Sequence, residues 1–158
     1  EELLNIPISI TSLTAHSIPS GTSFNREAWL EVIILDSNLD TVLQSGVVEN
    51  TESLNLADSS LTLFTSYLID SNNDTTNSIS KTYGIINGGL LQGFNTVPAY
   101  YNITISDEIV GLLDIQVRML FRAFKPSLLK EDHPDLLENL PIFEMASIRD
   151  TVYIQNPQ

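Results

Sequence analysis

Short segments rich in β-branched and aromatic residues alternate with clusters of Asp, Asn, Ser and Gly along most of the chain. This alternation is typical of an all-β protein. Residues 28–35 (AWLEVIIL) are almost wholly apolar and predict a central strand, followed by a turn at 36–40. The same pattern predicts further strands at 6–10, 41–48, 61–69, 97–105, 112–124 and 142–154.

Two parts of the sequence depart from this pattern. Residues 78–96 combine apolar pairs with four glycines, so we expect an irregular segment there. Pro126 opens the one helix that we expect, at about 126–140, and Pro141 ends it. The dipeptide His133-Pro134 is expected to bend or divide this helix, which would cover an open end or edge of the sheets.

The spacing of the predicted strands, with turns about every 8–12 residues, favours an immunoglobulin-like two-sheet β-sandwich. A length of 158 residues fits one domain spanning residues 1–158. Pro7 cannot donate a hydrogen bond to a neighbouring strand. We therefore expect residues 1–10 either as an edge strand or as a donor strand that inserts into a neighbour's sheet.

Charge and composition narrow the function. The chain has 7 Lys and Arg against 20 Asp and Glu, a net charge of −13, which argues against binding to nucleic acid or to an anionic membrane. No apolar run is long enough for a transmembrane segment. A low lysine content, many Ser, Thr and Asn residues and a first residue other than Met lead us to expect a processed, secreted, extracellular protein.

The sequence offers little catalytic chemistry. Because cysteine is absent, thiol catalysis, Cys-ligated iron–sulfur clusters and a covalently attached haem c are excluded for this chain. His16 and His133 are its only histidines, and neither a G-x-S-x-G nor an H-E-x-x-H motif accompanies them. Carboxylates are plentiful, but no spacing singles out a catalytic pair. We expect a protein that is not an enzyme.

Two Asp- and Asn-rich stretches have the spacing of calcium ligands. They are Asp36-x-Asn38-x-Asp40 and Asp70-x-Asn72-x-Asp74. Three oxygen-bearing side chains at alternate positions can converge on Ca²⁺, although neither stretch continues as an EF-hand loop. The same residue types form ordinary turns. We favour a plain turn for the first stretch and leave turn and calcium site equally open for the second.

The few cations are concentrated in one region, where Arg118 and Arg122 share a face of the strand predicted at 112–124. We expect them to form ion pairs with carboxylates such as Asp114 or Glu144, in preference to holding an anionic ligand. Trp29 lies within the most apolar segment. We expect it to be a buried anchor between the two sheets.

Two short motifs carry a family resemblance. They are His16-Ser-Ile-Pro19-Ser-Gly21 and, shortly after it, Arg26-Glu-Ala-Trp29-Leu30, followed by a strand, an Asp-rich turn and Ser45-Gly46. This arrangement resembles the H-x-x-P-[ST]-G…R-x-x-W-L pattern of the β-sandwich domain attached to many bacterial and archaeal multihaem c-type cytochromes. The resemblance continues through residues 63–70, 74–77, 117–122, 124–126 and 140–145, and so covers roughly 10–154.

The resemblance implies an extracytoplasmic electron-transfer setting in which the domain packs against haem-bearing polypeptide. It implies that His16 is a candidate axial ligand to a neighbouring haem, and that Arg26 or Arg122 reaches a haem propionate. This sequence departs from the family in lacking C-x-x-C-H, so any haem c would belong to a partner.

We therefore expect a non-catalytic docking module of an extracellular multihaem cytochrome assembly. Its partner would be a multihaem c-type cytochrome chain, or copies of itself in a filament. The alternative is a calcium-stabilised secreted surface or fibre subunit without a redox role.

Overall fold

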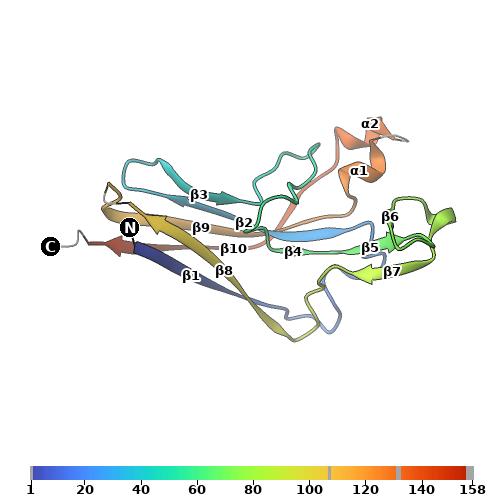
Figure 1. Cartoon of the computed structure of the whole chain (residues 1–158), viewed down its shortest axis with the longest axis horizontal. Coiled ribbons are helices and arrows are strands. Elements are labelled where there is room, and N and C mark those ends of the chain that lie inside the picture. Colours follow the sequence, from blue (N-terminus) through green and yellow to red (C-terminus); the bar gives the residue numbers. More distant parts are fainter. Residues whose placement is uncertain (1, 107, 131–132, 156–158) are drawn as a thin grey trace.

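The described residues form three sheets, and the largest is built around the most apolar segment of the chain. The computed structural model describes residues 2–106, 108–130 and 133–155. In this sheet β2 (Glu27–Leu35) pairs on one side with β9 (Gly111–Arg122) and on the other with β3 (Thr41–Ser45) and the short β4 (Leu63–Phe64). β10 (Phe143–Ile154) adds to β9 and forms the edge (Figure 1). The central position predicted for 28–35 is confirmed.

A two-stranded antiparallel sheet forms the second layer. It consists of β1 (Glu2–Thr11) and β8 (Thr96–Ile105), paired along their whole length. Alternate residues of both strands, such as Ile6 and Tyr101, are buried together with the inward-facing residues of β2 and β9, such as Val32 and Val117. The all-β sandwich expected from the pattern is thus observed, and β1 forms an edge strand within its own chain.

The segment predicted as one strand at 61–69 is interrupted. It is divided into β4 and β5 (Ser66–Ile69) at Thr65, a fully buried residue whose hydroxyl donates a hydrogen bond to the carbonyl oxygen of Arg26 at 2.8 Å. β5 starts a third sheet with β6 (Thr75–Thr76) and β7 (Gly84–Asn87). The irregular segment expected at 78–96 therefore contains a strand as well as the 3₁₀ turn Ile79–Lys81.

The helix expected at 126–140 is present only as two single turns, α1 (Pro126–Leu129) and α2 (Pro134–Leu137). Pro134 explains the division, because its ring cannot continue a helix and it has no N–H to donate. Pro126 and Leu129 of α1 are buried. In the described part of the chain, no helix is long and apolar enough to cross a membrane.

The outer face of the large sheet is partly covered by the loop at residues 46–62. Trp29 lies beneath this loop and is completely buried, in a small cluster with Leu54 and Leu120. The expectation that Trp29 lies between the two sheets is wrong, because Ala28 and Leu30 face the second layer while Trp29 points to the other side.

Candidate functional site

His16 is carried by two loops that are joined to each other. The loop at 12–20 follows β1 and the loop at 88–95 precedes β8, so the strand pair brings them together. Backbone hydrogen bonds connect them: Ser12 N to Asn95 O, Ile18 N to Leu91 O, Leu91 N to Ile18 O, and Phe94 N to Thr14 O, all at 2.8–3.0 Å. A Cβ atom at Gly93 would lie 2.7 Å from the carbonyl carbon of Ala15. Such close contact fixes the backbone that presents His16.

The imidazole of His16 is exposed and has a defined orientation. Its Nδ1 atom lies 3.1 Å from the carbonyl oxygen of Ser17. A carbonyl oxygen only accepts hydrogen bonds, so Nδ1 carries the proton in this contact. Nε2 has no hydrogen-bond partner among the residues described. In the neutral ring Nε2 is then unprotonated, and because the side chain is exposed it is accessible to a ligand such as iron.

Two exposed apolar side chains belong to the same pair of loops as His16. Leu13 is 84% exposed and Phe94 is 74% exposed. Phe94 is held at a φ of 55°, a left-handed conformation that a bulky residue seldom adopts. Exposed apolar groups of this size beside a histidine are suited to contact with a flat apolar ligand or partner. Sequence analysis missed both residues, because nothing in their local pattern indicates that the two loops meet.

Arg26 is close to the same turn. Its Nη1 atom donates a hydrogen bond to the carbonyl oxygen of Ser20 at 2.8 Å, and its side chain is half-buried. Nε and Nη2 make no hydrogen bond within the described residues. Arg26 thus bonds the connection that also carries His16, and its guanidinium has donors left for an anionic group.

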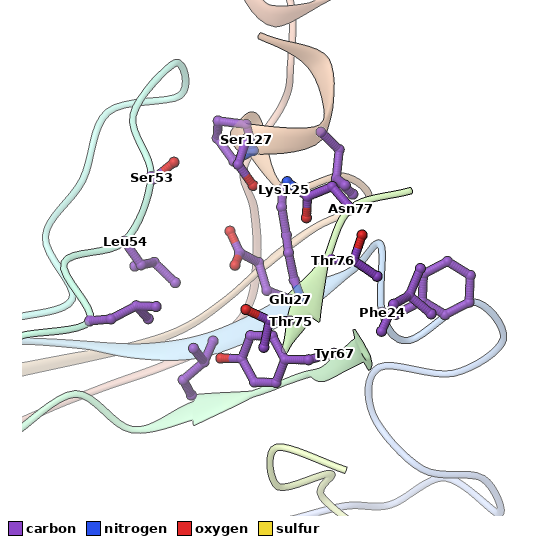
Figure 2. A pocket seen from close by; sticks show the side chains of 15 residues that line it. Phe24, Glu27, Ser53, Leu54, Tyr67, Thr75, Thr76, Asn77, Lys125 and Ser127 are labelled. Atoms are coloured by element: carbon purple, nitrogen blue, oxygen red, sulfur yellow. The ribbon is translucent and has the colours of Figure 1, made fainter. Parts of the chain in front are cut away.

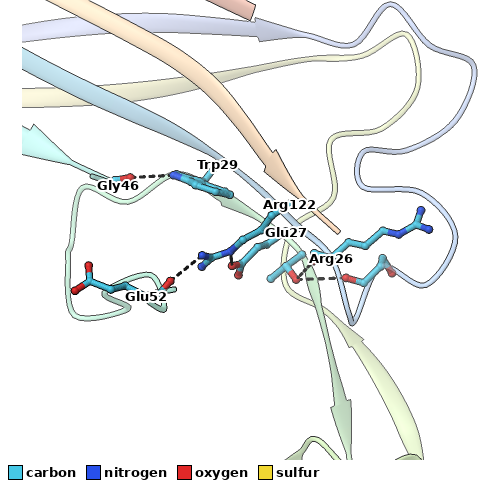
Figure 3. A network of polar contacts seen from close by, with 8 residues as sticks. Arg26, Glu27, Trp29, Gly46, Glu52 and Arg122 are labelled. Carbon is cyan, nitrogen blue, oxygen red and sulfur yellow. Dashed lines mark hydrogen bonds and ion pairs between the residues drawn. The ribbon is translucent and has the colours of Figure 1, made fainter. Parts of the chain in front are cut away.

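Arg122 lies elsewhere and is fully buried. Its Nε atom is 2.5 Å from Oε1 of Glu27, its Nη1 donates to the carbonyl oxygen of Glu52 at 2.7 Å, and its guanidinium stands 5.2 Å from the ring centre of Trp29 (Figure 3). This burial argues against the expected contact between Arg122 and a haem propionate. The guanidinium instead holds the 46–62 loop against the sheet.

Trp29 fixes the other end of that loop. Its Nε1 atom donates a hydrogen bond to the carbonyl oxygen of Gly46 at 2.9 Å (Figure 3). Gly46 has a φ of 68°, and a Cβ atom there would lie 2.3 Å from the carbonyl oxygen of Leu30. Only glycine fits such a close approach. The Ser45-Gly46 motif is therefore explained by packing around Trp29.

A pocket of about 200 Å³ opens beside Glu27, between α1, β5 and β6 (Figure 2). Within it, the Nζ atom of Lys125 donates to the carbonyl oxygen of Ser66 at 2.8 Å and lies 4.4 Å from the ring centre of Tyr67. Burial raises the pKa of Glu27 although Arg122 opposes this effect, and burial lowers the pKa of Lys125. Glu27 is the one carboxylate among the described lining residues, so the pocket does not provide the carboxylate pair of a glycosidase.

The two stretches with calcium-like spacing form the same kind of turn. Oδ1 of Asp36 accepts hydrogen bonds from the amides of Asn38 and Asp40, both at 2.8 Å. Oδ1 of Asp70 accepts the equivalent bonds from Asn72 and Asp74, at 2.8 and 3.1 Å. The bond from the Asp40 amide is the largest contribution that lowers the pKa of Asp36.

These turn hydrogen bonds argue against calcium sites. Each leading carboxylate is already an acceptor for its own loop, as in ordinary Asx turns. Across the described residues, no group of three or more His, Cys, Asp or Glu side chains is placed to hold a metal ion. The structure therefore shows that Asp36, Asn38 and Asp40, and likewise Asp70, Asn72 and Asp74, lie in Asx-type turns, and calcium binding at either turn stays a prediction.

The cations of β9 pair with different acids from those expected. Arg118 bonds Glu31 of β2 at 2.6 Å and also lies 3.7 Å from Glu144, which confirms one expected partner. Asp114 is bonded by Arg149 of β10 at 2.6 Å instead. Both Arg118 and Arg149 are therefore paired with acids, although their side chains remain 47% and 71% exposed.

Comparisons with known proteins give one relationship. No protein-family profile matches the chain, and no curated protein matches it. Among solved structures, a penta-heme cytochrome c552 from Thermochromatium tepidum is similar over 96% of this chain, with a TM-score of 0.73 and 18% sequence identity. The similar region makes up 37% of that protein. This chain thus shares the fold of part of a multihaem cytochrome, while it has no cysteine with which to attach a haem of its own.

Proposed function

We propose that this chain is a haem-free docking module of an extracellular multihaem cytochrome assembly. In this role it packs against a polypeptide that carries haem c, and His16 is the distal axial ligand of one haem. The fold similarity to part of a penta-heme cytochrome supports this role. The lack of cysteine means that the haem belongs to the partner.

The orientation of the His16 ring carries this proposal. An axial ligand must present an unprotonated nitrogen, and a hydrogen bond at the other ring nitrogen fixes the required tautomer. The contact between Nδ1 of His16 and the carbonyl oxygen of Ser17 meets this condition before any haem is bound. The hydrogen bonds between the two loops reduce the conformational entropy that ligation would otherwise cost.

The neighbours of His16 fit a haem edge in chemical character. Leu13 and Phe94 provide apolar surface for the macrocycle, and the free donors of Arg26 suit a propionate. In the assembly, the module would exclude water from the iron and stabilise its six-coordinate, low-spin state. This function is structural and electronic, and it needs no catalytic group on this chain.

A haem c peptide with an open sixth position tests the proposal. Microperoxidase is such a peptide, and an added imidazole ligand shifts its Soret band from the high-spin to the low-spin position. We expect titration with the wild-type protein to produce this shift. His16→Ala should weaken the apparent affinity roughly tenfold or more, equivalent to about 1.4 kcal/mol of binding free energy.

His133→Ala is the matched control, because His133 is the other histidine of the chain and is also exposed. It should bind microperoxidase as the wild type does. If His16→Ala also retains the wild-type affinity, or if both variants lose it equally, the ligand role of His16 is refuted.

A further inference from the structure

One layer of this acidic protein, β1 with β8, carries a single charged residue, Glu2 at the start of β1. Residues 3–25 and 82–106 contain no Asp, Glu, Lys or Arg, although the whole chain has a net charge of −13. These two segments include β1 and β8 except Glu2, and the loops that carry His16. Among the described residues, the other acidic and basic side chains lie in the large sheet and its connections, except Lys81 in a 3₁₀ turn and Asp70 and Asp74 in the turn between β5 and β6. The distribution separates an uncharged layer from a charged one.

The outward side of this layer, which we call the uncharged face, is formed by odd-numbered residues from 3 to 11 on β1 and even-numbered residues from 96 to 104 on β8. All of them are exposed. Tyr100, opposite Pro7, is 60% exposed near the middle of β8. Loss of charge with an aromatic residue at the centre is the composition that distinguishes the core of a protein–protein interface from ordinary surface.

Several side chains of the uncharged face are already ordered by their cross-strand neighbours. Asn5 Nδ2 donates to Asn102 Oδ1 at 2.6 Å, and the hydroxyls of Thr11 and Thr96 lie 2.8 Å apart. Side chains that are ordered before association lose less entropy when a partner covers them. The face is therefore prepared for contact in the free protein.

We propose that the uncharged face binds a second copy of this chain. A basic partner would be attracted to the acidic sheet and not to this neutral layer. A partner with the same negative charge can approach closely only where charge is absent, and a second copy fits this requirement.

The geometry of such a pair also limits electrostatic repulsion. If two copies stack through their uncharged faces, two uncharged layers lie between the two charged sheets. At about 10 Å per layer, the charged sheets are roughly 30 Å apart, several times the Debye length of about 8 Å at physiological ionic strength. The remaining repulsion is then largely screened.

The size of the uncharged face sets the affinity that we expect for the dimer. Two ten-residue strands provide a footprint of about 33 Å by 10 Å, and the adjoining loops enlarge it. Before the loops are added, this area is about 330 Å² per copy, below the roughly 800 Å² per partner of a standard interface, so the dimer is expected to be weak, with a dissociation constant of roughly micromolar or higher. This inference does not depend on haem ligation by His16.

Sedimentation equilibrium of the full chain tests the inference over about 1 µM to 1 mM protein, which brackets an interface of this size. We expect a monomer–dimer equilibrium that keeps its strength, or strengthens only slightly, when NaCl rises from about 0.1 M to 1 M, because little repulsion is left to screen as the Debye length shortens from about 10 Å to 3 Å. An association based on opposite charges would weaken under the same change.

Two matched substitutions locate the interface. Tyr100→Glu places a charge at the middle of the uncharged face and should weaken the dimer roughly tenfold or more. Tyr153→Glu makes the same change on β10, at a side chain that is 66% exposed, and should leave the dimer near its wild-type strength. Circular dichroism of both variants checks the fold.

A protein that stays monomeric over the whole range at both salt concentrations overturns the inference. A dimer that Tyr100→Glu leaves intact, or that Tyr153→Glu weakens equally, also overturns it. Neither outcome affects the microperoxidase experiment, so the two proposals fail independently.

Discussion

Two ion pairs on the outer face of the large sheet have the same chemistry but different surroundings. Glu27 faces Arg122 and Glu31 faces Arg118 in the register of β2 and β9. In both pairs the glutamate is nearly buried. The arginines differ: the side chain of Arg122 is 0% exposed beneath the 46–62 loop, whereas that of Arg118 is 47% exposed.

The difference shows that the covering loop, and not the pairing itself, decides what each arginine does. Arg122 forms an ion pair with Glu27, donates a hydrogen bond to the backbone of Glu52 and lies over the ring of Trp29. These contacts connect the loop to the sheet. Arg118 bonds Glu31 and approaches Glu144, while water reaches its guanidinium. A buried charge depends strongly on its partner, whereas a half-exposed one is partly solvated.

The largest expected effect comes from Arg122→Met. This change leaves Glu27 buried without its counter-charge and removes the bond to Glu52, so unfolding should become easier by about 3–5 kcal/mol. Urea denaturation measures this loss. Arg122→Lys keeps the charge but cannot reach both acceptors, so it should lower the free energy of unfolding less than Arg122→Met does. If Arg122→Met lowers the free energy of unfolding no more than Arg118→Met does, burial beneath the 46–62 loop does not strengthen the Glu27–Arg122 pair.

The second prediction uses the pH dependence of stability to distinguish two acids of the paired strands β2 and β9, Glu27 and Asp114. Burial raises the pKa of Glu27 in the folded state above its ordinary value of 4.5. Its contribution to stability is therefore fully present below about pH 4.5 and decreases as the pH rises through the raised pKa. The unfolding free energy of the wild type minus that of Glu27→Gln should fall with rising pH across this window.

Asp114 is the matched acid with the opposite sign. Hydrogen bonds from Arg149 and Gln116 lower its pKa below the ordinary 3.8. Its contribution is present above pH 3.8 and is lost as the pH falls through the lowered pKa. The unfolding free energy of the wild type minus that of Asp114→Asn should therefore rise with pH. Slopes of the same sign for the two variants would contradict the assignment.

The smallest effect is expected from Arg118→Met. Because this guanidinium is half in water, the loss of unfolding free energy should be about 1 kcal/mol or less, and added salt should reduce it further. Urea denaturation at low and high salt provides the measurement. A loss similar to that of Arg122→Met would show that exposure does not distinguish the pairs.

The sequence predicted the long strands well, because strongly patterned segments fold according to their own periodicity. Segments 28–35, 97–105 and 142–154 are strands within a residue or two of the expected bounds. The prediction for 61–69 missed the break, because the hydroxyl of Thr65 is bound by a backbone carbonyl far away in the sequence. The division of the helix that His133-Pro134 predicted is confirmed, because Pro134 begins a second, separate turn.

The candidate site was predictable only in part. The exposed turn at His16 follows from its Pro and Gly content, whereas Leu13 and Phe94 become its neighbours only through the pairing of β1 with β8. Trp29 was assigned to the wrong face because both faces of β2 are buried, and alternation of polar and apolar residues then carries no information. The calcium hypothesis stays a prediction, because Asp and Asn have the same spacing in turns and in ion-binding loops.

The sequence by itself determined which strands form, that no haem c attaches to this chain, and that charge is absent from two long segments. These properties depend on residue type and local order alone. Only the tertiary structure decided that β1 and β8, one strand from each segment, form one layer, that Glu27 meets Arg122, and that two loops hold His16 in place. Those contacts depend on strand register, which joins residues far apart in the chain and is set by packing of the whole core.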